Sequence, residues 1–176
     1  MKKFELTSEF VTFLGKKLFR IKALVSFGDV AEGELGGFIE RENNLDQSGD
    51  AWVSGDARVF GNAQVSGDAR VYGDALVFGN AQVSGDAWVY GDARVYGDAL
   101  VQSCRDYSAT SCFGSENRTT TFFRTKDGGI SVRCGCFYGT LREFREKVKE
   151  RHGDSRLAKE YLMLADSMEF RLSKDE

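Results

Sequence analysis

A chain of 176 residues with 41% hydrophobic residues and a net charge of −3 suits one domain or two small ones. Its charged, alternating start carries no secretory signal and no apolar run is long enough to span a membrane, so we expect a cytoplasmic protein. Four cysteines are too few for a secreted disulfide framework. The central tract, residues 49–102, carries 3 basic and 7 acidic side chains, which disfavours nucleic acid as a partner.

Residues 1–48 combine alternating and glycine-rich stretches. Apolar and basic side chains alternate over residues 19–23, which predicts a strand. The Gly15-Lys16 pair before it predicts a hairpin with residues 10–14. The glycine-rich passage 33–40 then leads into the central tract. We expect this first segment to form an N-terminal β cap and an irregular opening coil.

Residues 49–102 consist of nine tandem copies of a six-residue unit, Gly-Asp/Asn-Ala-x-Val-x, and the register never slips. Such a tract folds as a solenoid whose rungs stack on one another. Ala and Val are two positions apart, so both point inward on a short strand while the residue between them points outward. The Gly-Asp/Asn pair turns the corner, because these residues tolerate positive φ.

A second period of 18 residues gives the number of sides. Trp52, Arg70 and Trp88 are 18 residues apart, so three units make one coil of a triangular prism with three coils. An aliphatic residue followed four positions later by a small one, as in Val53 and Ala57, recurs throughout the tract. On this pattern it resembles the left-handed parallel β-helix of hexapeptide-repeat proteins, and the left hand is implied by that resemblance. Three coils are only about 15 Å tall, so the stack needs caps or oligomerisation.

The outward positions are aromatic or basic on two of the three faces. These candidate binding and interface residues are Trp52, Arg70, Tyr72, Trp88 and Tyr90 on one face, and Arg58, Phe60, Phe78, Arg94 and Tyr96 on the next. So many rings exceed the apolar surface that a soluble monomer usually exposes. One interpretation is a homo-oligomer interface, for which the β-helix resemblance favours a trimer. Another is a docking surface with arginine–ring contacts, and a cleft between subunits would combine the two.

The corner positions form a column of seven aspartates and two asparagines. Calcium binding and mimicry of a phosphate backbone are two functional interpretations of this column. Corner chemistry is the simpler explanation, because Asp and Asn side chains bond the backbone of tight turns. We therefore expect neither a metal nor a cofactor here.

Residues 103–176 leave the repeat and predict a C-terminal cap. Two β-prone runs, 119–125 and 130–137, flank Lys126-Asp127-Gly128-Gly129, which is typical of a β-hairpin. The capping box Thr140-Leu141-Arg142-Glu143 begins a first helix, which ends at Gly153. A second helix follows, capped by Asp154 or Ser155. The apolar faces of the two helices comprise Leu141, Phe144 and Val148 in the first, and Leu157, Tyr161, Leu164 and Met168 in the second.

The single histidine, His152, bears on enzymatic activity. Among hexapeptide-repeat proteins, acyltransferases use a His base and carbonic anhydrases use three His around a metal. One histidine cannot build the three-His site, and the repeats carry no loop insertions of the kind that shapes an acyltransferase site. A His before Gly-Asp is typical of a helix C-terminus. We therefore expect no enzyme, with an acyltransferase-like activity as the weaker alternative.

Cysteines and arginines of the C-terminal segment are further candidates. The cysteines are Cys104, Cys112, Cys134 and Cys136. They could hold zinc, but their spacing lacks the usual C-x₂₋₄-C knuckles, and we expect buried free thiols. The candidate anion contacts around the hairpin are Arg118, Arg124 and Arg133. A solvated strand face is the alternative explanation for these arginines.

Several short motifs lie outside the repeats. They are Lys17-Leu18-Phe19-Arg20-Ile21, Leu35-Gly36-Gly37-Phe38-Ile39-Glu40, Thr120-Thr121-Phe122-Phe123-Arg124, Cys134-Gly135-Cys136-Phe137 and His152-Gly153-Asp154. On these motifs the chain resembles a family of bacteriophage and prophage proteins of Gram-positive bacteria, a resemblance that brings no activity with it. It implies an effector acting in the cytoplasm of the bacterial host.

Our hypothesis is a non-enzymatic binding protein that counteracts a host defence, either by inhibiting a host protein or by sequestering a nucleotide signal. The alternative is a structural or assembly component of the virion. The predicted organisation is a cap at residues 1–48, a β-helix at 49–102, and a β-hairpin with a helical hairpin at 103–176.

Overall fold

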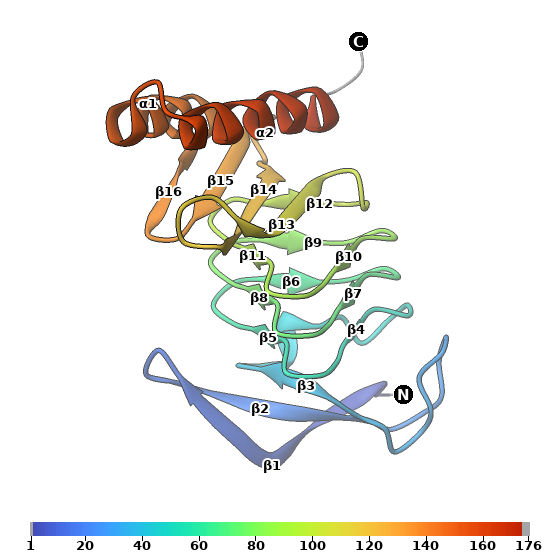
Figure 1. Ribbon diagram of the computed structural model, residues 1–176. Helices are drawn as coiled ribbons and strands as arrows, with labels where there is room; N and C mark the ends of the chain where they lie inside the picture. Colours follow the sequence, from blue (N-terminus) through green and yellow to red (C-terminus); the bar gives the residue numbers. More distant parts are fainter. Residues whose placement is uncertain (1, 174–176) are drawn as a thin grey trace.

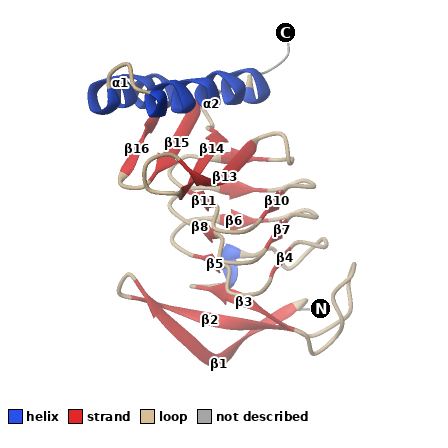
Figure 2. Cartoon of the chain, viewed as in Figure 1, coloured by secondary structure: helices blue, strands red, loops and turns tan. Residues whose placement is uncertain are grey.

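The computed structural model describes residues 2–173 as a stack of β coils with a cap at each end (Figure 1). An N-terminal hairpin closes one end, and a small antiparallel sheet carrying two helices closes the other (Figure 1). Short strands and turns form the middle of the molecule, and both long helices lie together at the C-terminal end (Figure 2). The predicted mainly β architecture with a helical C-terminal cap is confirmed.

Each hexapeptide forms one short parallel strand. These strands are β4 (Trp52–Val53), β5 (Arg58–Val59), β6 (Gln64–Val65), β7 (Arg70–Val71), β8 (Leu76–Val77), β9 (Gln82–Val83), β10 (Trp88–Val89), β11 (Arg94–Val95) and β12 (Leu100–Val101). Every third strand pairs, giving the three-stranded sheets β4-β7-β10 and β6-β9-β12 and the run β5-β8-β11, which is half of a six-stranded sheet. The 18-residue period therefore corresponds to one coil, as predicted. The left hand of the coil stays a prediction.

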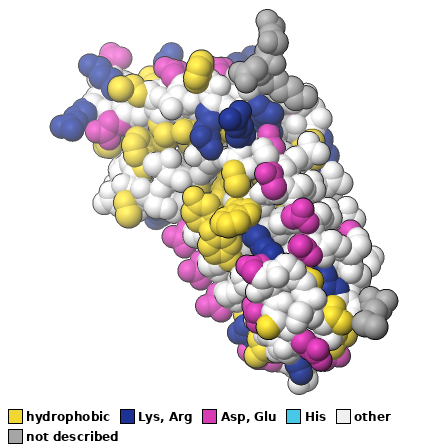
Figure 3. All heavy atoms as spheres, turned by 90° about the vertical axis from the view of Figure 1, so that its right-hand side faces the viewer, with side chains coloured by type: hydrophobic (Ala, Val, Ile, Leu, Met, Phe, Trp, Pro, Cys, Tyr) yellow, Lys and Arg dark blue, Asp and Glu magenta, His cyan; other side chains and the backbone are white. Residues whose placement is uncertain are grey.

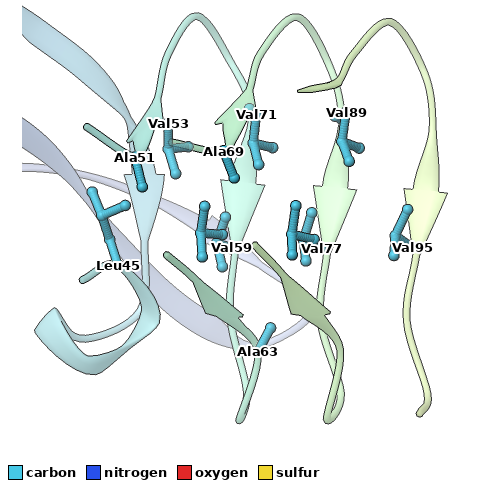
Figure 4. Close-up of a cluster of buried hydrophobic side chains, with 14 of the residues drawn as sticks. Leu45, Ala51, Val53, Val59, Ala63, Ala69, Val71, Val77, Val89 and Val95 are labelled. Atoms are coloured by element: carbon cyan, nitrogen blue, oxygen red, sulfur yellow. The ribbon is translucent and has the colours of Figure 1, made fainter. Parts of the chain in front are cut away.

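The alanine and valine columns fill the interior of the stack. All nine alanines and all nine valines of the units are buried. Figure 4 shows several of them, including Val53, Val71 and Val89 on successive coils, with their side chains inside the coil. Main-chain hydrogen bonds join the coils, for example from the Trp52 N–H to the Ala69 carbonyl oxygen at 3.0 Å. Stacking thus satisfies the backbone while it buries the small apolar columns.

Glycine is required at the corners for two physical reasons. Gly67 has a φ of 66°, in the left-handed region that side chains disfavour. A Cβ at this position would also lie 3.0 Å from the backbone nitrogen of Gly85 in the next coil. The repeated glycine therefore serves both the turn and the close approach of successive coils.

The N-terminal segment adds a hairpin and an opening coil. Strands β1 (Phe4–Phe13) and β2 (Lys16–Ala23) pair antiparallel, and β2 also pairs with β3 (Leu35–Ile39). Strand β3 runs parallel to β5, and after the short 3₁₀ helix η1 (Glu42–Asn44) Leu45 bridges Val65 in parallel. The solenoid therefore begins with a partial coil before the first hexapeptide, as expected for this segment.

The C-terminal sheet is larger than the predicted hairpin. It is a meander of β13 (Tyr107–Phe113), β14 (Arg118–Arg124), β15 (Ile130–Cys134) and β16 (Phe137–Thr140), in which β14 and β15 are the predicted hairpin. The predicted strand over 130–137 is wrong in one respect, because it breaks after Cys134. Gly135 adopts a φ of 57°, and the turn pairs Cys134 with Phe137. Cys134 and Cys136 therefore do not share one strand.

Two helices cover this sheet and close the second core. Helix α1 (Leu141–His152) begins at the predicted capping box, in which the Glu143 N–H donates to the Thr140 hydroxyl at 3.2 Å. It ends at Gly153, and Ser155 caps α2 (Arg156–Leu172). The apolar face of α1 is buried as predicted.

The buried face of α2 differs from the predicted stripe. Of that stripe only Tyr161 is buried, and Leu157, Leu164 and Met168 are half-buried. The residues buried instead are Ala158, Ala165 and Leu172. Small alanines let the helix approach its neighbours closely, so the larger side chains lie at the edges of the contact.

Candidate functional site

The first aromatic face is partly covered by the N-terminal segment. Trp52 was expected to point outward into solvent, but it is only 3% exposed because Phe4 and Phe27 pack against its ring, with centroids 6.4 and 5.4 Å away. Arg70 pairs with the Asp29 carboxylate of the loop between β2 and β3 and donates to the Asp50 carbonyl oxygen. Trp52 and Arg70 therefore belong to the contact with the cap, a correction of the predicted interface.

The second aromatic column is a stacked ladder in which Phe60 is buried and Phe78 and Tyr96 are half-buried. Phe78 lies between Phe60 and Tyr96, with ring centroids 4.9 and 4.5 Å away and nearly parallel planes. Phe13 of the N-terminal hairpin packs on Phe60, and Tyr138 of β16 packs on Tyr96. Phe60 is only 4% exposed, so its predicted place on an open interface is wrong. The ladder connects the two caps along the outside of the coil.

Of the aromatic columns only Trp88 and Tyr90 stay exposed, and they form a patch with the half-buried Tyr72. Tyr72 and Tyr90 stack at 5.3 Å, and Trp88 meets Tyr72 edge-on at 6.4 Å. Trp88 and Tyr90 are 51% and 52% exposed. Hydrophobic side chains gather on the side of the molecule that carries the sheet β4-β7-β10 (Figure 3). We name Tyr72, Trp88 and Tyr90 the aromatic patch.

A groove of about 540 Å³ lies on the neighbouring face, over strands β5, β8 and β11. Phe13 at the end of β1 lines one side of it, and Ser111, Cys112 and residues 117–119 of the β13–β14 hairpin line the other. Both hairpin ends project toward the same side of the solenoid (Figure 1). Because the walls come from both caps, neither the repeats nor one cap alone would form this groove.

Four arginines line the groove. They are Arg58 and Arg94 from the repeats and Arg118 and Arg133 from the C-terminal sheet. In the strand register Leu76 of β8 lies between Arg58 of β5 and Arg94 of β11. Strands β5 and β11 are therefore about 10 Å apart. Asp74 and Asp92 supply the opposing charge. We name this cavity the arginine groove, and its excess of positive charge contrasts with a chain that is negative in total.

The arginines of the groove keep hydrogen-bonding capacity. The Arg58 guanidinium stacks on Phe13 at 4.8 Å, and within residues 2–173 its buried Nε has no hydrogen-bond partner. Arg133 lies over the Tyr96 ring at 5.8 Å. Arg118 approaches Glu116 at only 3.8 Å, a long and exposed ion pair. Guanidinium groups held in this way can accept an anion without first breaking strong internal bonds.

Arg124, the third predicted anion contact, has a structural role instead. Its guanidinium pairs with Asp106 at 3.1 Å and donates to the carbonyl oxygens of Leu172 and Ser173 at 2.6 and 2.8 Å. These bonds tie β14 to the end of α2. Arg118 and Arg133 lie in the groove as candidate contacts, whereas Arg124 does not.

A second cavity, of about 590 Å³, lies between the C-terminal sheet and the helices. Phe137, Phe144, Val148 and Tyr161 are among the apolar residues that line it. His152 lines it as well and stacks on Tyr161 at 5.6 Å, at the C-terminal end of α1 as predicted. We name this cavity the helix pocket.

The four cysteines are free thiols at separate places. Cys112 lines the arginine groove, Cys134 and Cys136 line the helix pocket, and Cys104 lines neither. All except the half-buried Cys134 are exposed, so the expectation of buried thiols is wrong for three of them, which lie in or beside turns. Within the part of the chain that the structure describes, no three metal-binding side chains gather at one place.

The groove was missed as a site because its parts lie far apart in sequence. Arg58 and Arg94 are two coils apart in the repeat, and this spacing indicated that both lie on one face of the solenoid. Asp74 and Asp92 were interpreted as members of the corner column, with calcium binding and phosphate mimicry as the functional alternatives, and not as part of a groove. No pattern in the repeats indicates that Arg118 and Arg133 fold back over that face.

Comparison with known proteins supports the repeat fold alone. The YdcK beta solenoid repeat family matches this chain at residues 51–67, 63–79, 69–85 and 81–95. These matches lie within the hexapeptide tract and include no part of either cap. No curated protein matches the sequence. Among the described residues, no helix has the length and apolar character needed to cross a membrane.

Proposed function

We propose that this protein is a non-enzymatic binding protein that holds a small phosphate-bearing ligand in the arginine groove. The observation that carries the proposal is the convergence of Arg58, Arg94, Arg118 and Arg133 on one cavity. Guanidinium groups bind phosphate oxygens with paired, charge-assisted hydrogen bonds. A groove of about 540 Å³ is within the size range of small-ligand sites.

The charge pattern favours a compact anion over a nucleic acid. The corner aspartates run along the solenoid and would repel an extended phosphate backbone. Asp74 and Asp92 at the groove itself would restrict how many phosphates enter. A short ligand with two or three phosphates can meet the arginines without lying along the acidic columns.

The cellular role that we propose follows from the resemblance to phage proteins. A phage effector in the host cytoplasm that sequesters a nucleotide signal would counteract a defence that depends on that signal. The alternative is a structural or assembly component of the virion. Mass spectrometry of purified virions distinguishes the two, because an effector should be missing from them and a structural component should be present.

The aromatic patch supports a second, separate contact. Two exposed rings beside the half-buried Tyr72 suit either a homo-oligomer, for which we favour a trimer, or a host protein that this chain inhibits. A Trp88→Glu variant would place a charge in either contact. Retention of both the subunit number and partner capture in this variant would contradict a role for the patch.

Calorimetric titration with inorganic triphosphate tests the proposal. Wild-type protein should bind, and Arg94→Glu should weaken binding about 10- to 100-fold by removing one charged contact and adding repulsion. Arg105→Glu is the matched control, because Arg105 is also exposed and lies outside the groove. Equal affinity of Arg94→Glu and wild type, or no binding to wild type, would overturn the proposal.

A catalytic role predicts a different result for a His152→Ala variant. An acyltransferase-like enzyme using His152 as its base should lose all turnover in a His152→Ala variant. A binding protein should keep its affinity for triphosphate in the same variant, since His152 lines the helix pocket and not the groove.

A further inference from the structure

The helix pocket has the composition of a site for an aromatic ligand with negative charge. Its wall includes the half-buried ring of Phe137 and the exposed ring of Tyr138, with the buried rings of Phe144 and Tyr161 behind them. Lys147 and Arg151 of α1 also line it, Lys147 in an ion pair with Glu150 at 2.9 Å, and Glu116 is the one acidic residue of the lining. An aromatic ring is favourable against such a wall, and negative charge is favourable beside the two cations.

The helix pocket and the arginine groove adjoin each other. Arg118 and Gly135 line both cavities, so the start of β14 and the β15–β16 turn form the boundary between them. Gly135 has no side chain to separate the two spaces. Arg118 pairs only with Glu116 at 3.8 Å among the described residues, and it is exposed. A ligand in contact with Arg118 can therefore extend in both directions.

We propose that the ligand is a nucleotide whose base occupies the helix pocket and whose phosphates pass Arg118 into the arginine groove. This inference rests on the proposed function, since it requires the groove to bind phosphate. A nucleotide combines the two chemistries that the adjoining cavities offer, a planar aromatic ring at one end and several phosphate groups at the other. Stacking on protein rings recognises any base by its π face.

The positions of the cysteines provide a direct test with the wild-type chain. Cys112 lines only the arginine groove, Cys136 lines only the helix pocket, and Cys104 lines neither, while all three thiols are exposed. The rate at which a maleimide modifies each thiol, followed by peptide mass spectrometry, thus reports on each cavity separately. The two probes are inorganic triphosphate, which has no base, and ATP.

The nucleotide proposal gives a distinct pattern for each probe. At a concentration about ten times its Kd, triphosphate should slow modification of Cys112 about tenfold and leave Cys136 unchanged. ATP at the same saturation should slow both thiols to about that extent, and Cys104 should react at its free rate throughout.

Other outcomes overturn one proposal or the other. If ATP protects Cys112 but not Cys136, the base does not enter the helix pocket, and the nucleotide inference is wrong while phosphate binding stands. If ATP protects Cys136 alone, the ligand does not span the two cavities, and the inference is also wrong. If neither probe protects Cys112, the proposed function itself fails.

Discussion

The guanidinium of Arg58 lies 4.8 Å from the centroid of the Phe13 ring, so the N-terminal hairpin holds an arginine of the first coil in place. The buried Nε of Arg58 has no hydrogen-bond partner within residues 2–173. The cation–π contact with Phe13 therefore helps to hold the guanidinium in position. The cap therefore both closes the solenoid and orients a charged side chain at one edge of the arginine groove.

A Phe13→Ala variant should weaken triphosphate binding about three- to tenfold, because Arg58 loses its cation–π contact and becomes free to move. Phe10→Ala on the same strand is the control, since Phe10 packs on Phe19 outside the groove. Calorimetry on both variants measures the effect. Equal affinities for the two variants would show that Phe13 does not position Arg58.

The aromatic ladder should contribute strongly to stability. Phe78→Ala removes the ring between Phe60 and Tyr96, and we expect a loss of about 2–4 kcal/mol in the free energy of unfolding. Tyr90→Ala removes a half-exposed ring of the aromatic patch and should cost about 1 kcal/mol or less. Chemical denaturation of both variants measures the difference. Similar losses would mean that the ladder is not part of the folded core.

The two tryptophans should respond differently to a soluble quencher. In Trp88→Phe the remaining Trp52 is buried, so its fluorescence should lie at shorter wavelength and resist acrylamide. In Trp52→Phe the remaining Trp88 is half-exposed and should be quenched readily in dilute solution. Quenching of Trp88 that decreases as protein concentration rises would support oligomerisation through the aromatic patch. Equal quenching of Trp52 and Trp88 would contradict the burial of Trp52 by the N-terminal cap.

Glu40 should make stability depend on pH. Burial disfavours its charged form, but hydrogen bonds from Lys16 at 2.7 Å and from the Gly61 N–H at 2.6 Å outweigh burial and lower its pKa. A lowered folded-state pKa gives stability above the unfolded value of about 4.3, and this stability is lost as the pH falls through the folded pKa.

At pH 7 we therefore expect Glu40→Gln to be less stable than wild type by about 1–2 kcal/mol, or about 3–6 °C in Tm. The difference should shrink on acidification and vanish once Glu40 is protonated in the folded protein. Glu32→Gln, at an exposed loop position, should leave Tm unchanged at either pH. A Glu40→Gln difference that is the same at neutral and acidic pH would contradict this account.

Regular patterns in the sequence predicted the repeat, the three faces of its coil, both ends of the first helix and the start of the second. The alternation of Ala and Val, the positive φ of the corner glycines and the capping box at Thr140 all act within a few residues. The extra strands β13 and β16 were missed because their residues show no clear alternation beside the hairpin signal.

Contacts between distant segments could not be predicted in this way. Nothing near Trp52 in the sequence indicates that Phe4 and Phe27 cover it, and nothing near Arg58 indicates that Phe13 stacks on it. The arginine groove depends on the same long-range packing, since both caps must fold over one face of the repeats. The predicted residues Arg58, Arg94, Arg118 and Arg133 were individually recognised, but their common cavity was not.

Native mass spectrometry with inorganic triphosphate tests the central claim most directly. The wild-type protein, purified from cells without denaturation, should show one bound triphosphate or co-purified phosphate ligand per subunit, and at a triphosphate concentration near the wild-type Kd the adduct on Arg94→Glu should be much smaller. The same spectra give the subunit number. Wild-type subunits without any adduct, or equal adducts on both proteins, would contradict phosphate binding in the arginine groove.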